Sequence, residues 1–263
     1  MSTELPPWWA MKNDPDDWIY YQHQFSVSVI MEYSIQPSMS KNVEDSHMSI
    51  SETATMLRWL QKRLSFRKET YSTISMLDRL QAREEEIPID WLKIVCVKDD
   101  SNDDIFVYDD GLDSGVSVKV KCDPDAFFGL NELEKSEWVI HVVEQACEKL
   151  FDKTNIALSN VIDACNQVKR LHYRNKWMWG QRWSPDGKHQ ARVSVTQDTQ
   201  KTHIDFEIYN AKGFLLHSTC IEDTPYLPDV WRRYLNDIEW VSNDSVRLHM
   251  DETYIELGFE DVE

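Results

Sequence analysis

The fold is decided by the stretch LSNVIDACNQVKRLHYRNKWMWGQRWSPDGKHQARVSVT, residues 158–196, because its hydrophobic period changes partway along. Its first part repeats apolar residues at helical spacing, namely Leu158, Val161, Ile162, Cys165 and Val168. After KWMWGQRW the segment 191–196 alternates apolar and polar residues, as a half-buried strand does. Between them SPDGK is typical of a tight turn. We therefore predict that a helical region ends near residue 172 and a β-region begins near residue 177.

Downstream of this stretch the alternating pattern continues in short runs separated by the turn sequences NAKG, SND and DE. The expected strands are His203 to Tyr209, Phe214 to Thr219, Ile238 to Trp240, Ser245 to Met250 and Tyr254 to Leu257. These runs predict a mainly antiparallel β-sheet over 177–263.

Upstream, Asn131-x-x-Glu134 resembles a capping box and opens a second apolar stripe of helical period. The two stripes predict a central helical hairpin near 131–171. Further upstream, Ser49-x-x-Glu52 precedes another helical pattern, so we expect one or two helices over about 50–86.

The remaining apolar runs of the N-terminal part indicate strands. One lies within Phe25 to Ile35, and three more, Trp91 to Val97, Ile105 to Tyr108 and Val116 to Lys121, predict a three-stranded meander. The fold class is thus α+β: N-terminal mixed strands and helices with the helical hairpin, followed by a mainly antiparallel C-terminal sheet. We expect two regions, 1–172 and 177–263.

The charge balance excludes several classes of partner. The chain of 263 residues carries 46 Asp and Glu against 28 Lys and Arg, a net charge of −18. Such a surface repels phosphate, so we expect no direct nucleic-acid partner and no membrane partner. RNKWMWGQRW (174–183) interleaves basic and aromatic residues as single-strand binders do, but its positive charge is too small to offset the rest. No signal-peptide pattern or long apolar run occurs, which predicts a cytoplasmic protein.

The sequence contains no recognisable catalytic or metal-binding motif. GxSxG, HExxH, Walker A and GxGxxG are all missing, so we expect neither catalysis nor a cofactor. DDSNDD (99–104) begins like a calcium loop, but Ile105 and Gly111 stand where Gly and Glu are required, which leaves only a weak adventitious cation site open. The five cysteines form no CxxC pair and are expected to be reduced.

The excess of acidic residues is greatest in the C-terminal region, which carries a net charge of −8 over 177–263. The segment TPYLPDVW (224–231) is a long connection in which a binding loop fits. We therefore predict a partner-binding surface there, with acidic residues for charge and two aromatic residues as anchors. Its members are Asp223, Tyr226, Asp229, Trp231, Asp237, Glu239 and Asp244.

A compact acidic chain with aromatic residues near acidic loops resembles, in general character, the immunity proteins and inhibitors that neutralise a basic toxin or nuclease. Nuclease active sites are positively charged clefts, which an acidic surface can occlude. The sequence thus predicts an inhibitor of this type that binds a basic protein. The alternative is a non-catalytic adaptor or scaffold subunit of a larger assembly, and an enzyme of unrecognised type is the third possibility.

Overall fold

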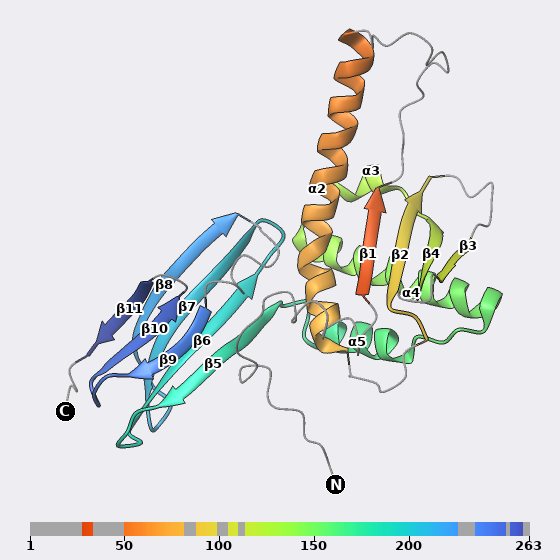
Figure 1. The fold of residues 1–263 in the computed structure, drawn as a ribbon. Helices are drawn as coiled ribbons and strands as arrows, with labels where there is room; N and C mark the ends of the chain where they lie inside the picture. Colours follow the sequence, from red (N-terminus) through yellow and green to blue (C-terminus); the bar gives the residue numbers. More distant parts are fainter. Residues whose placement is uncertain are drawn as a thin grey trace.

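The computed structural model describes residues 28–33, 50–81, 88–98, 105–109, 114–225, 235–250 and 253–259. These residues form two lobes (Figure 1). The N-terminal lobe combines one sheet with helices, and the C-terminal lobe is built from antiparallel strands. The α+β class and the mainly antiparallel C-terminal half are therefore confirmed. Each lobe has its own cluster of buried apolar side chains.

The sheet of the N-terminal lobe has the strand order β1-β2-β4-β3. Its strands are β1 (Ser28–Tyr33), β2 (Trp91–Val97), β3 (Ile105–Asp109) and β4 (Ser114–Lys121). The predicted meander is wrong, because β2 and β4 pair in parallel and β3 lies at the edge. The burial of the strands explains this order: Val116 and Val118 of β4 are fully buried, whereas Val107 of β3 is 61% exposed. The more apolar strand occupies the interior of the sheet.

Three long helices pack against this sheet and one another: α2 (Ile50–Leu80), α4 (Glu132–Thr154) and α5 (Ser159–Arg170). The region expected to hold one or two helices forms the single helix α2. The capping box of α4 is confirmed, because the Asn131 side chain accepts a hydrogen bond from the backbone N–H of Glu134 and the Glu134 side chain accepts one from that of Asn131.

An aromatic cluster fastens the middle of α2 to the short helix α3 (Pro124–Phe127) and to α4. Phe66 is fully buried, and its ring centroid lies 5.1 Å from that of Phe127 and 5.9 Å from that of Trp138. Both pairs are edge-to-face, the arrangement that aromatic quadrupoles favour. Beyond α3, α2 continues as a projecting helix (Figure 1).

The C-terminal lobe consists of two sheets, where the sequence predicted one. The four-stranded sheet has the order β5-β6-β7-β8 and the three-stranded sheet has the order β11-β10-β9. Their strands are β5 (Lys176–Trp183), β6 (His189–Gln197), β7 (Lys201–Asn210), β8 (Leu215–Pro225), β9 (Leu235–Trp240), β10 (Ser245–Met250) and β11 (Thr253–Gly258). Buried residues of β6 and β7 share one core with those of β9, β10 and β11, so the sheets pack face to face.

The first residues of strand β8 lie outside this core. Its residues Leu215 to Ser218 are exposed on both faces, and it lies at the edge of its sheet within the described part of the chain. The pairing with β7 skips Leu216 and Ile221, so β8 carries two bulges. Bulges bend an edge strand and redirect its side chains.

Glycine at position 115 is required by a close approach between β2 and β4. Gly115 pairs with Trp91, and a Cβ atom at this position would lie 1.9 Å from the Trp91 ring. We expect Gly115→Ala to lower the free energy of unfolding by about 1–3 kcal/mol, because the indole must move out of its site. Urea unfolding measures this change. Gly129→Ala is the control, since its Cβ would meet only the Ala126 carbonyl oxygen at 3.5 Å; equal losses in both variants would contradict the prediction.

Candidate functional site

Two of the predicted partner-binding residues, Asp237 and Glu239, lie on β9 and are already engaged within the lobe. The Asp237 carboxylate lies 3.2 Å from the Arg182 guanidinium, and the Glu239 carboxylate lies 2.7 Å from Nε2 of His249. Both contacts are exposed, so each contributes little to stability. They nevertheless reduce the charge that these two residues present to a partner.

The structure does not gather all the predicted residues on one surface. Strand β9 lies over β5, because the Trp240 indole N–H donates to the Arg182 carbonyl oxygen at 3.0 Å. Asp223 belongs to β8, at the opposite edge of the four-stranded sheet, about 14 Å away at the usual strand spacing. Asp244 is exposed in the turn between β9 and β10. Tyr226, Asp229 and Trp231 lie outside the described residues.

Sequence reasoning missed an exposed apolar patch at the start of β8, formed by Phe214, Leu215 and Leu216. These side chains are 65%, 52% and 42% exposed. The signal in the sequence is the uncharged run FLLHSTCI (214–221), whose first six residues, Phe214 to Thr219, predict a strand and do not by themselves indicate an exposed surface. On the neighbouring strand β7, Glu207 and Tyr209 lie opposite Ser218 and Leu215, so acidic and apolar groups adjoin here.

The turn that carries this patch is held by its own hydrogen bonds. The Asn210 side-chain oxygen accepts bonds of 3.0 Å from the backbone N–H groups of Lys212 and Phe214. Gly213 has φ +83°, a conformation that glycine adopts without strain. Phe214 is therefore presented on an ordered turn, which lowers the entropy that binding would cost.

The predicted SPDGK turn is also confirmed. The Ser184 hydroxyl donates to the Asp186 carboxylate at 2.7 Å, and Gly187 has φ +71°. The pKa of the Asp186 carboxyl is lowered, because this hydroxyl and the Lys188 backbone N–H both donate to it. The neighbouring run RNKWMWGQRW forms β5, which the sequence did not predict.

A buried polar seam joins the two lobes. Asn175 is 5% exposed; its side-chain N–H group donates to the Ser72 carbonyl oxygen at 2.7 Å and to the Gln197 side-chain oxygen at 3.1 Å. The Asn175 oxygen accepts a 2.7 Å bond from Arg79, whose guanidinium also stacks on the Trp177 ring. Buried amides need such partners, and these come from α2 and from Gln197 at the end of β6.

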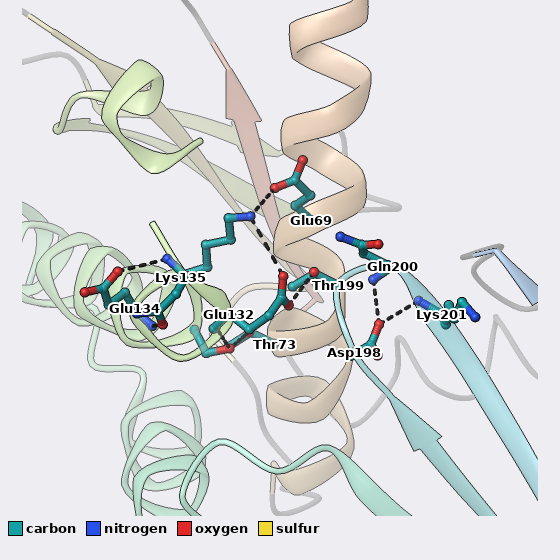
Figure 2. Close-up of polar contacts among 11 residues, drawn as sticks. Glu69, Thr73, Glu132, Glu134, Lys135, Asp198, Thr199, Gln200 and Lys201 are labelled. Carbon is teal, nitrogen blue, oxygen red and sulfur yellow. Dashed lines mark hydrogen bonds and ion pairs between the residues drawn. The ribbon is translucent and has the colours of Figure 1, made fainter. Parts of the chain in front are cut away.

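A second set of polar contacts extends the seam toward the start of α4 (Figure 2). The Thr199 hydroxyl, in the β6–β7 turn, donates to the Glu132 carboxylate. The Lys135 ammonium lies 2.8 Å from the Glu69 carboxylate and 3.9 Å from that of Glu132. The β6–β7 turn itself is braced by Asp198, which accepts bonds of 2.7 Å from the backbone N–H groups of Gln200 and Lys201.

This arrangement is suited to holding the lobes together rather than to chemistry. Its carboxylates are paired with Lys135 and Thr199, and neither a histidine nor a thiol is among the bonded side chains. Among the described residues no group of three or more His, Cys, Asp or Glu side chains is placed to hold a metal ion. We therefore assign the seam a positioning role.

The five cysteines form no disulfide, and three of them are buried: Cys96, Cys147 and Cys165. Burial, with the nearby Glu144 and Glu148, raises the pKa of Cys147 to about 12. Burial likewise raises the pKa of Cys165, and a hydrogen bond with Cys122 raises that of Cys96. A thiol held protonated in this way is a poor nucleophile, so none of the three is suited to nucleophilic catalysis.

No protein-family model matches the chain, and no curated protein or solved structure is significantly similar to it. None of the helices in the described part of the chain is long and apolar enough to cross a bilayer.

Asn175 is the residue on which the seam depends most. We expect Asn175→Ala to lower the free energy of unfolding by about 1–3 kcal/mol, because Ser72, Arg79 and Gln197 each lose a partner in a buried setting. Asn166→Ala, at an exposed position of α5, is the matched control and should change little. Urea unfolding compares the two variants. Equal unfolding midpoints for the Asn175→Ala and Asn166→Ala variants would show that the hydrogen bonds of Asn175 contribute nothing to stability.

The cysteine environments predict selective alkylation. Thiolate is the reactive form, so near about pH 8 iodoacetamide should modify exposed Cys220 well before Cys96, Cys147 or Cys165. The raised pKa of Cys147 keeps its thiol protonated until the pH approaches 12. Mass spectrometry of peptides measures each rate, and the same reaction in urea is the control, in which all five should react. Native labelling of Cys147 at the rate of Cys220 would refute the assignment.

Proposed function

We propose that this chain is an acidic binding protein, of the immunity type, that neutralises a basic toxin or nuclease by occluding its active site. The observation that carries the proposal is the C-terminal lobe, which has 16 acidic against 8 basic residues over 177–263 and an ordered apolar patch beside acidic side chains.

The two features have different roles in the proposed complex. The acidic field speeds the encounter with a basic partner and selects against acidic ones. The apolar patch Phe214–Leu216 supplies the anchor, because large side chains that lose water on binding carry most of the affinity. Since Asp237 and Glu239 already face Arg182 and His249, the proposed contact is centred on β8 and its flanking acidic residues, including Asp223.

Occlusion explains why such a protein needs no catalytic group. A nuclease cleft is positively charged because it binds phosphate. A surface of carboxylates is attracted to the same cleft and competes with the phosphate groups of the substrate. The seam at Asn175 supports this role, because a rigid lobe loses less freedom when it binds.

The alternative is a non-catalytic adaptor or scaffold subunit. It is favoured by one specific observation: the projecting helix α2 bears exposed leucines far from β8, which gives the molecule a second apolar surface (Figure 1). An adaptor binds two partners at separate surfaces, whereas an inhibitor needs one.

Capture with the full chain as bait identifies the partner and separates the two functions. We expect a single basic protein whose enzymatic activity falls when the chain is added in stoichiometric amount. Recovery of an acidic assembly of several subunits would instead support the adaptor. A captured basic enzyme that keeps full activity in the complex would overturn the inhibitor proposal.

The captured partner also permits a test of the surface. Neutralising Asp223, Asp229 and Asp244 to Asn should slow association several-fold, because electrostatic steering acts on the association rate. The control neutralises three exposed acidic residues of α4, as Glu137→Gln, Glu148→Gln and Asp152→Asn, which changes the net charge equally. Stopped-flow mixing measures both rates. If both triple variants associate equally slowly, the association rate depends on net charge and not on a localised acidic surface.

A further inference from the structure

Helix α2 is longer than the body on which it packs. It has 31 residues, and from Ala54 onward, where the structure describes its side chains, the first fully buried one is Phe66, in the second half of the helix. The part before α3 projects beyond the sheet (Figure 1). Within the described part of the chain, this part contacts the body through Trp59, which packs partly against the core, and through Lys62, whose ammonium lies 2.8 Å from the Asp125 carboxylate.

Three leucines form a stripe on this part of α2. Leu57, Leu60 and Leu64 are 55%, 38% and 68% exposed, and their spacing of three and four residues places them on one face. Phe66 lies on the opposite face, in the aromatic cluster. The leucine stripe is thus separate from the core and has the spacing by which one helix anchors on another.

The stripe continues a face of α2 that is already an interface. Ser75 follows Leu64 by eleven residues, which is three helical turns, and lies on nearly the same face. At Ser72 and Ser75 this face contacts the C-terminal lobe, because the Ser72 and Ser75 hydroxyls donate to Gln197 at 3.0 and 2.8 Å. The same face thus contacts the C-terminal lobe near the C-terminal end of α2 and exposes leucines nearer its N-terminal end.

We propose that the leucine stripe packs against the same stripe of a second copy of this chain, with the two α2 helices antiparallel. This isologous contact requires no residue of the C-terminal lobe. A test of the dimer is therefore independent of a test of the proposed inhibition. A two-fold axis near Leu60 lets each copy cover the leucines of the other.

The charges on α2 select the antiparallel arrangement. Between Ala54 and Lys68 the helix has five basic residues and no acidic one, which leaves −23 on the rest of the chain. A parallel pair would set Arg67 beside the partner's Arg67, and like charges there destabilise a helix pair. In an antiparallel pair with its axis near Leu60, Arg67 and Lys68 lie opposite positions 53 and 52 of the second copy, neither of which is basic. Each basic helix also approaches the acidic body of the other copy.

A bilayer of anionic lipid is a less suitable occupant. A basic amphipathic helix is attracted to such a surface, at roughly 1 kcal/mol for each Lys or Arg. The −23 on the remainder of the chain is repelled by the same lipids, and it outnumbers the helix charge more than fourfold. A second copy of the chain buries the leucines and also brings an acidic body close to the basic helix.

Sedimentation of the full chain over a wide concentration range tests the dimer. We expect a reversible dimer whose dissociation constant rises at least about tenfold in the double variant Leu57→Ser, Leu64→Ser. The control Leu133→Ser, Phe151→Ser removes two exposed apolar residues, 51% and 49% exposed, from α4 and should leave the dimer intact. Circular dichroism confirms that each variant folds.

Three results would overturn the proposal. The chain could be a monomer at every concentration, the dissociation constant could be unchanged in the α2 variant, or the α4 control could weaken the dimer as much as the α2 variant does. Co-sedimentation of a monomeric chain with vesicles containing phosphatidylserine, abolished by the α2 variant, would assign the stripe to a lipid surface instead.

The orientation has its own test, Arg67→Cys in a Cys220→Ser background. In the antiparallel pair the two new thiols lie about 20 Å apart along the helix axis, too far for a disulfide. We expect no cross-linked dimer on a non-reducing gel. Rapid cross-linking would show that the helices are parallel.

Discussion

The arrangement of the two lobes depends on the carboxamide of Asn175. A buried amide must find donors and acceptors, and those of Asn175 come from α2 and from the end of β6, segments that are far apart in the sequence. Few relative orientations of the lobes satisfy Ser72, Arg79 and Gln197 together. This constraint decides which part of α2 the C-terminal lobe covers, and therefore which part is left exposed.

The acidic character of the chain is a weaker guide to its binding surface than the net charge implies. Asp237, Glu239 and Glu256 each lie within 3.3 Å of a basic group of their own lobe. Charge compensated within the lobe adds little to the field that a partner meets, so the surface is better defined where acidic strands adjoin exposed apolar side chains. Beside Phe214 the acidic neighbour on β7 is Glu207, which lies opposite Arg192 of β6, so the exposed apolar side chains are the stronger feature of this surface.

Local patterns in the sequence predicted the elements, and contacts between distant residues decided the rest. The capping box at Asn131 and the turn at Gly187 depend on neighbours in the chain, so both were predictable. Strand β5 was missed, because in KWMWGQRW aromatic and basic residues do not alternate cleanly. The meander was wrong because order along the chain does not fix order in a sheet. The ion pair of Asp237 joins residues 55 positions apart, which no local pattern indicates.

The same limit applies to α2, whose helical period is clear in the sequence but whose exposed leucines are not. Both halves show apolar residues at helical spacing, and only the packing of Phe66 reveals which of them face the body. The projecting half has unfavourable charges along the helix: Arg58 with Lys62 and Arg63 with Arg67 are like charges four residues apart, each pair unfavourable by about 0.2–0.5 kcal/mol. Of these four residues, Lys62 also lies 2.8 Å from the Asp125 carboxylate of α3. Removing the leucines from water stabilises such a segment, whereas its own charges do not. A helix with this composition is therefore better suited to packing against a partner than to standing alone in solvent.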